Sequence, residues 1–217
     1  MPRAKKPAED PPGRDREATE RRFVEAAARV LARDGAAGLG VNAIATEAGA
    51  DKKLIYRYFG GLDGVLEALG AATGVWIGDL APTPTNAKAR SDYGARMLAA
   101  FTAYAEKLRG DLVLQKLLAW ELAGPSDALG RIDTARSRQM GKMMHAIRGD
   151  AVPPAGVDAP AINAIALAAL NYLVLRGATT GSFAGLPLKT EADWKRATTA
   201  LESLLAAAYE KNRWRKL

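Results

Sequence analysis

The residues best suited to chemistry in this 217-residue chain lie close together, between positions 41 and 59. Five of them carry a cation or a phenol, namely Lys52, Lys53, Tyr56, Arg57 and Tyr58. Ammonium, guanidinium and phenol groups donate hydrogen bonds, and the phosphate oxygens of nucleic acids accept them. The segment is therefore suited to contact with phosphate groups or base edges.

Two short helices about a tight turn would position these donors. Apolar residues recur at helical spacing over 41–48, Gly49 can adopt the left-handed conformation that a tight turn needs, and Asp51 can cap a second helix over 52–58. The residues expected to face inward are Ile44, Ala48, Ala50, Ile55 and Tyr58, and Ala45 is small where the two helices must approach. This is the spacing of a helix-turn-helix motif.

A major groove would accept the second of these helices. Lys52 and Lys53 at its amino end would then meet base edges or phosphates, while Tyr56 and Arg57, one turn later, would reach the backbone. A helical hairpin whose cations form a solvated face over a core fits the same pattern. Net charge does not decide between DNA binding and a solvated face, because the excess of +7 is divided almost evenly between residues 1–62 and the rest of the chain.

The elements around this segment all read as helices, so the expected fold class is all-α. No alternating run of branched residues bounded by turns indicates a strand, and a glycine-rich connector is expected over 177–187. The expected helices span 16–33, 41–48, 52–58, 62–79, 88–109, 112–122, 126 or 127 to 148, 160–177 and 191–213.

The composition excludes several kinds of chemistry. The chain has no cysteine, which removes disulfides, thiolate metal sites and cysteine nucleophiles and suits a reducing compartment. Its one histidine, His145, rules out a zinc site built on a histidine pair and has no nucleophile nearby in the sequence. We therefore expect no metal, no cofactor and no catalytic residues, and a cytoplasmic location.

Neither end nor centre of the chain predicts a membrane segment. Residues 1–13 are proline-rich, lack an apolar core and include Arg3, Lys5 and Lys6, which indicates a disordered basic arm rather than a secretory signal. The most apolar stretch, 161–175, contains two asparagines and falls short of the roughly 20 residues that a bilayer crossing needs. A buried helix is the better interpretation of that stretch.

From about residue 16 to 69 the sequence resembles the TetR family of bacterial repressors. The matching residues, in order, are Ile44-Ala45, Ala48-Gly49, Asp51, Ile55-Tyr56-Arg57-Tyr58-Phe59, Asp63 and Leu66. The resemblance implies a helix-turn-helix DNA-binding domain at 14–61, followed by a ligand-sensing and dimerisation domain at 62–217. It also implies that Tyr56 contacts a phosphate and that Phe59 packs within the three-helix domain. The expected DNA-contacting set is Lys52, Lys53, Leu54, Tyr56, Arg57 and Tyr58.

Two residues depart from the pattern of the family. Gly40 stands where a threonine often caps the second helix, and Leu62 stands where a lysine commonly opens the fourth. Losing that lysine removes a phosphate contact. The arm at 1–13, or Arg14 and Arg16, could supply the missing electrostatic attraction.

The carboxy-terminal helices carry a stripe of methionines and aromatics that is open to two interpretations. It is either ordinary core or the lining of an adaptable apolar cavity with a few polar groups. The candidate ligand-contacting residues are Met97, Phe101, Tyr104, Trp120, Glu121, Met140, Met143, Met144 and Asn171.

The last two helices carry more apolar surface than one contact face needs. A two-fold interface between copies of the chain would bury it, and Leu173 and Leu205 are the positions expected within that interface. The sequence thus predicts a homodimeric regulator, released as a repressor from a palindromic double-stranded DNA operator by a small, largely apolar effector. The helix over 62–79 would be the lever between the two domains. The alternatives are a DNA-binding or interaction module with a filled core, and a small α-helical enzyme.

Overall fold

The computed structural model describes residues 14–78, 92–123 and 127–209, without the side chains of 14, 74–78, 128, 136, 139–141 and 143. Helices dominate the described residues, which confirms the all-α class. The elements are α1 (Arg14–Asp34), η1 (Ala36–Gly38), α2 (Val41–Ala48), α3 (Lys52–Phe59), α4 (Leu62–Gly78), α6 (Tyr93–Gly110), α7 (Leu112–Ala123), α8 (Asp127–Arg148), α9 (Ala159–Thr179), β1 (Ser182–Phe183), β2 (Leu186–Pro187) and α10 (Glu191–Tyr209). The starts and ends expected at 79, 88 and 213 lie outside the described residues.

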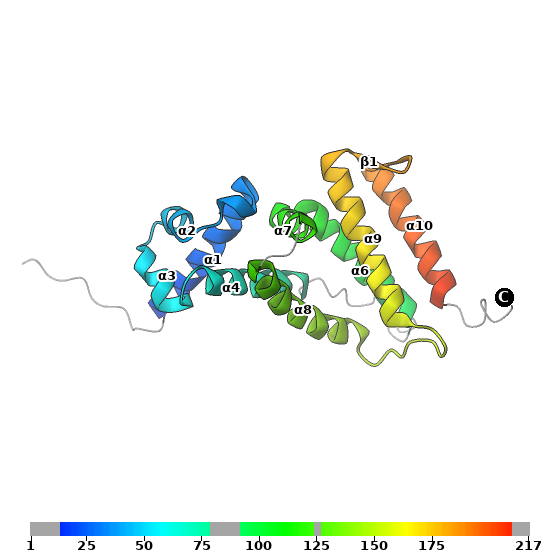
Figure 1. Cartoon of the computed structure of the whole chain (residues 1–217). Coiled ribbons are helices and arrows are strands. Elements are labelled where there is room, and N and C mark those ends of the chain that lie inside the picture. The colour runs from blue at the N-terminus through cyan, green and yellow to red at the C-terminus, as the bar shows by residue number, and fades with distance from the viewer. Residues whose placement is uncertain (1–13, 79–91, 124–126, 210–217) are drawn as a thin grey trace, which may run out of the picture.

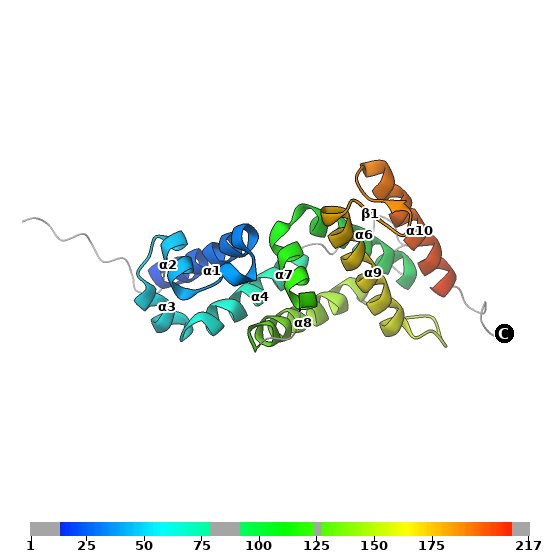
Figure 2. The same ribbon diagram turned by 45° about the horizontal axis from the view of Figure 1, so that its top comes forward.

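The helices form an elongated molecule with two different ends. Helices α1, α2 and α3 lie at one end, and α9, α10 and the short strands lie at the other (Figures 1 and 2). Helices α4 and α8 lie between the two ends and run alongside one another. Among the described residues, contacts between the two ends run mainly through this middle pair and through α7.

The amino-terminal core is apolar and closely packed. Its fully buried members on α1 to α4 are Phe23, Ala26, Ala27, Leu31, Ile44, Ile55, Val65 and Leu69. Leu117 of α7 and Ile132 of α8 are fully buried in the same cluster. The proposed domain boundary after residue 61 therefore does not divide the packing, because the amino-terminal core is completed by helices of the second proposed domain.

The crossing of α4 and α8 depends on a glycine. A Cβ atom added at Gly70 would lie 2.7 Å from the backbone oxygen of Ile132 and 2.9 Å from its Cα. Thr73, which is fully buried, donates its hydroxyl to the Gly70 carbonyl at 2.9 Å. Near the start of α4, Asp63 pairs with Arg131 of α8 at 3.4 Å. Gly70 thus lets the two helices approach more closely than any larger residue would allow.

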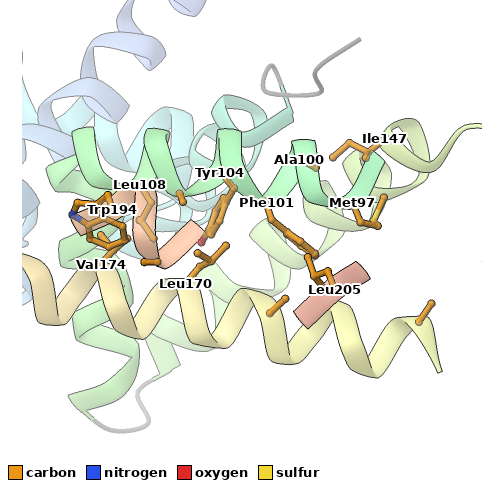
Figure 3. Packing of buried hydrophobic residues seen from close by; sticks show 14 of the residues in the cluster. Met97, Ala100, Phe101, Tyr104, Leu108, Ile147, Leu170, Val174, Trp194 and Leu205 are labelled. Carbon is orange, nitrogen blue, oxygen red and sulfur yellow. The ribbon is translucent and has the colours of Figure 1, made fainter. Parts of the chain in front are cut away.

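The carboxy-terminal core is built on α6. Figure 3 shows a row of α6 side chains, from Met97 to Leu108, that faces α9. Met97, Phe101 and Leu108 are fully buried or nearly so, and Leu170 of α9 and Trp194 of α10 pack in the same cluster. Most of the expected methionine and aromatic stripe on this helix is therefore core.

The expectation that α9 is a buried helix was only half right. One face packs on α6 through Leu170 and Val174, but the opposite face is exposed, with Ile165 at 70% and Tyr172 at 43%. The helix has 21 residues and, among the described residues, is long and apolar enough by length and composition to cross a membrane. Only 22% of its most apolar window is buried.

The glycine-rich connector contains a small β-hairpin that the sequence pattern did not predict. Ser182 pairs with Pro187 and Phe183 with Leu186, and the two intervening residues, Ala184 and Gly185, both have positive φ. Two-residue strands are too short to show an alternating pattern, and the turn lacks the usual Asn-Gly signal.

Candidate nucleic-acid interface and cavity

The turn between α2 and α3 adopts the geometry that its sequence predicts. Gly49 is left-handed (φ 60°, ψ 40°), and its N–H donates to the Thr46 carbonyl at 3.1 Å. The Asp51 carboxylate then accepts from the backbone N–H of Lys53 at 2.8 Å, which starts α3 at Lys52. Gly40 precedes α2 without a side-chain cap, as its lack of a side chain requires.

Removing the cap should destabilise the start of α3. We expect Asp51→Ala to lower the free energy of unfolding by about 1 kcal/mol, or roughly 2–4 °C in Tm for a chain of this size. Asp51→Asn retains an acceptor oxygen and should keep most of the stability. Thermal unfolding of the two variants and wild type provides the measurement. Equal losses in both variants would show that the carboxylate charge, rather than the cap, stabilises the turn.

Arginines of α1 hold α2 in place, and sequence reasoning missed them. Arg22 donates to the Ala48 carbonyl at 2.7 Å, while Arg29 and Arg33 both donate to the Glu47 carboxylate at 2.8 Å. The hydrogen bonds from Arg33 and then Arg29 lower the pKa of Glu47. The sequence holds no signal for these pairs, because they join residues 14 to 26 positions apart.

Four of the six predicted DNA-contacting residues lie exposed on α3. They are Lys52, Lys53, Tyr56 and Arg57. Tyr56 is 57% exposed, and the Lys52 ammonium donates to the Asn42 side-chain oxygen at 3.2 Å. Exposed donors at the end of the molecule can reach a ligand without a change in fold.

The other two predicted residues, Leu54 and Tyr58, are half-buried. Leu54 packs against the amino-terminal core, which leaves it little free surface. The Tyr58 ring lies close to two guanidiniums, with Arg16 at 5.2 Å and Arg57 at 5.8 Å from its centre. Tyr58 therefore links α1 to α3 and brings the charge of Arg16 beside α3.

The departure at Leu62 has a packing explanation. Leu62 is half-buried against the amino-terminal core, where a lysine would have to bury part of its stem. Phe59, three residues earlier, meets the ring of Phe23 edge-on at 6.2 Å, in line with its expected packing role. Arg3, Lys5 and Lys6 of the expected arm lie outside the described residues.

A cavity of about 420 Å³ lies between α6, α8 and α9. Two of the predicted ligand contacts, Met97 and Met144, line it. Its other lining residues are Tyr93, His145, Arg148, Pro160, Asn163, Ala164 and Leu167, none of which was among the predicted contacts. A pocket of this size falls within the range of small-molecule sites.

The remaining predicted contacts are not gathered at this cavity. Phe101 is buried in the core, and the Tyr104 hydroxyl donates to the Asn171 side-chain oxygen at 2.5 Å between α6 and α9. Trp120 and Glu121 are half-buried on α7, where Trp120 packs against the amino-terminal core. The side chains of Met140 and Met143 lie outside the described residues.

A buried polar network underlies the cavity. Asn163 of α9 donates its amide to the Tyr93 hydroxyl of α6 at 2.8 Å and accepts from the Tyr209 hydroxyl of α10 at 2.5 Å. The two tyrosine rings meet edge-on at 5.3 Å. In the sequence, Asn163 is one of the two asparagines that interrupt the apolar stretch 161–175. Its spacing gives no hint of partners 70 and 46 positions away.

Within the described ranges, no group of three His, Asp or Glu side chains is arranged to hold a metal ion. His145 is exposed at the rim of the cavity.

Helices α1, α2 and α3 form a three-helix unit with a tight turn and an exposed, cationic third helix. This is the architecture of a helix-turn-helix DNA-binding domain.

Comparison with known proteins agrees with this architecture. Residues 23–69 match the sequence profile of the bacterial regulatory proteins of the tetR family. The HTH-type transcriptional repressor SCO4008 of Streptomyces coelicolor is 53% identical over 47 residues, which are 22% of this chain and 24% of that protein. The likeness in sequence to this family rests on residues 23–69, and the matched segment spans about a quarter of the length of the curated relative.

Solved structures extend the likeness in fold to the carboxy-terminal helices. The fatty acid degradation regulator FadR from Bacillus halodurans has a TM-score of 0.63 at 16% identity, covering 88% of this chain and 99% of that one. The multidrug binding protein EbrR, complexed with ethidium, has a TM-score of 0.58 at 20% identity, covering 90% and 99%.

Proposed function

We propose that this protein is a ligand-responsive, DNA-binding transcriptional regulator that acts in the cytoplasm as a homodimeric repressor. The observation that carries the proposal is the exposed face of α3, where Lys52, Lys53, Tyr56 and Arg57 lie together at one end of the molecule. The match of residues 23–69 to the tetR family supports it. No catalytic step is part of the proposal.

Substitutions on α3 test DNA binding. Full-length protein would first select its preferred duplex from a pool of random sequences. Tyr56→Phe removes one phosphate donor and should weaken binding about equally on all duplexes, by roughly 0.5–1.5 kcal/mol. Lys52→Ala or Lys53→Ala should cost about 1–3 kcal/mol if the lysine reads a base edge, and should then relax the sequence preference.

Salt dependence separates the two roles of the lysines. Loss of a phosphate contact should lower the slope of log affinity against log salt by about one. Lys195→Ala, an exposed lysine on α10 at the far end of the molecule, is the matched control. Unchanged affinity in all three α3 variants would overturn the assignment of α3 as the recognition helix.

The exposed face of α9 supports the homodimer. Its residues are apolar and exposed at successive helical turns, namely Ala161, Ala164, Ile165, Ala168, Ala169 and Tyr172. On α10, Leu204 is 69% exposed. Small residues allow close approach of a second helix, and a second copy of the chain would cover this surface.

The middle of the molecule offers a route from cavity to recognition helix. Helix α8 is continuous from Ile132, which lies against Gly70 of α4, to Met144 at the cavity, about 18 Å further along at 1.5 Å per residue. An effector that favours one position of α8 would therefore bias α4 and the spacing of the two recognition helices. Effector and DNA would then weaken each other's binding by the same factor.

A further inference from the structure

The cavity between α6, α8 and α9 has an apolar wall and a polar, buried floor. Met97, Met144 and Leu167 supply the wall. Tyr93 and Asn163 form the floor and are only 6% and 7% exposed. A ligand in this cavity would therefore meet apolar atoms along its body and hydrogen-bonding groups at its inner end.

The hydroxyl of Tyr93 accepts one hydrogen bond, and its own hydrogen remains available for another. Because an amide nitrogen only donates, the Tyr93 oxygen must be the acceptor of its 2.8 Å bond from Asn163. Within the described part of the chain, the Tyr93 hydroxyl donates to no acceptor. An acceptor atom on a ligand in the cavity could take this hydrogen in place of a water molecule.

The third member of the network fixes the orientation of the amide. The Tyr209 hydroxyl donates to the Asn163 oxygen at 2.5 Å, so the amide nitrogen points to Tyr93. Burial, and then the neighbouring Tyr93, raise the pKa of Tyr209, which keeps that hydroxyl protonated as a donor. The Tyr93 oxygen therefore accepts from Asn163, and the hydrogen of the Tyr93 hydroxyl is left for a ligand.

The rim of the cavity is basic. His145 and Arg148 on the last turn of α8 are both exposed, and the described lining includes no Asp or Glu. Among the described residues, Arg148 makes no ion pair. Its positive charge is therefore available to attract an anionic ligand into the cavity.

We propose that the effector site takes a small amphipathic monoanion of the medium-chain carboxylate class. The carboxylate would accept from Tyr93 at the inner end, the positive charge of Arg148 at the rim would attract it, and the alkyl chain of the ligand would lie against Met97, Met144 and Leu167. The volume of 420 Å³ equals about fourteen water volumes of roughly 30 Å³, so a ligand of about a dozen non-hydrogen atoms fits. This inference rests on the proposed function, because it names the effector class of the same regulator.

Titration calorimetry on the full-length protein tests the carboxylate proposal. The three probes have alkyl chains of equal length and are decanoate, decan-1-ol and decyltrimethylammonium. Decanoate should bind at least about tenfold more tightly than the alcohol, as expected for hydrogen bonds to a charged group. Arg148→Gln should remove most of that preference and leave the affinity for the alcohol within about twofold. Lys142→Gln, an exposed charge on α8 outside the cavity lining, is the matched control and should change neither affinity.

A second variant tests the floor. Tyr93→Phe keeps the ring contact with Tyr209 but removes the free donor, so decanoate should bind about tenfold more weakly. Since this change also leaves the Asn163 amide without its acceptor, thermal unfolding must show that the variant is folded. Arg148→Gln, at an exposed position, tests the proposal even where Tyr93→Phe does not fold.

Three results would overturn the carboxylate assignment. They are binding of none of the probes, equal affinity for decanoate and decan-1-ol, and preference for the cationic probe. Binding of the selected DNA duplex by wild-type protein without probe is measured separately. DNA binding with no response to decanoate would refute the effector class and leave the DNA-binding proposal standing. Absence of DNA binding would refute the proposed function itself.

Discussion

Ile165→Asp combined with Leu204→Asp should convert the protein from a dimer into folded monomers that bind DNA about 10²- to 10⁴-fold more weakly. Both side chains are about 70% exposed in the monomer, so the aspartates cost little there. In a dimer each would place an unpaired charge in an apolar contact, at a cost of several kcal/mol. Monomers hold one recognition helix each and lose the gain from binding two half-sites at once.

Sedimentation and DNA titration at the same protein concentration provide the measurement. Leu122→Asp introduces the same charge at a leucine of α7 that is 71% exposed, and this control should remain dimeric. A wild-type protein that sediments as a monomer at micromolar concentration would contradict the prediction. So would a double variant that stays dimeric.

The two leucines that the sequence placed in the dimer interface are not suitable test positions for that interface. Leu205, expected within the interface, is 4% exposed and belongs to the core of the monomer, and Leu173 packs against the same core. A charge at Leu205 would unfold the chain rather than release monomers. The apolar pattern indicated that α9 and α10 each have two apolar faces. It could not show which face packs within the monomer and which is left for a second copy, because α9 and α10 also pack on α6.

Local signals predicted the turn and recognition helix well. Gly49 and Asp51 act within two or three residues of their own positions, through a left-handed backbone and a side-chain cap. The same holds for the start of α9, where Asp158 accepts from the Ala161 N–H at 3.1 Å. Such interactions depend on residues that are neighbours in the sequence, so the sequence pattern contains them.

The cavity could not be predicted in the same way. Methionines and aromatics at helical spacing occur in both core and pocket, and the structure buries Phe101 while placing Met144 at the cavity. The decisive polar group, Tyr93, depends on Asn163, which is 70 positions away. Which face of α6 meets which face of α9 is a tertiary property that the periodicity of one helix does not contain.

Gly70→Ala should destabilise the protein by about 1–3 kcal/mol, the usual cost of overpacking a core, and should weaken binding of the selected DNA duplex. The new Cβ would lie 2.7 Å from the Ile132 oxygen and 2.9 Å from its Cα, and backbone atoms cannot rotate out of the way. Helices α4 and α8 must therefore separate. Because α4 follows α3 along the chain, their separation would change how the two α3 helices of the proposed dimer are spaced.

Gly130→Ala is the matched control on the partner helix. A Cβ at Gly130 meets nothing within 4 Å, and alanine is better than glycine in a helix by about 1 kcal/mol, so this variant should be slightly more stable than wild type. Urea unfolding gives the two stabilities, and titration of the duplex with and without decanoate gives the coupling. If α4 and α8 transmit the effector signal, Gly70→Ala should reduce the factor by which decanoate weakens DNA binding, while Gly130→Ala keeps it. The prediction would be contradicted if the Gly70→Ala protein were as stable as the Gly130→Ala protein and decanoate weakened its DNA binding as much as in wild type. The close crossing of α4 and α8 would then not transmit the effect of the ligand.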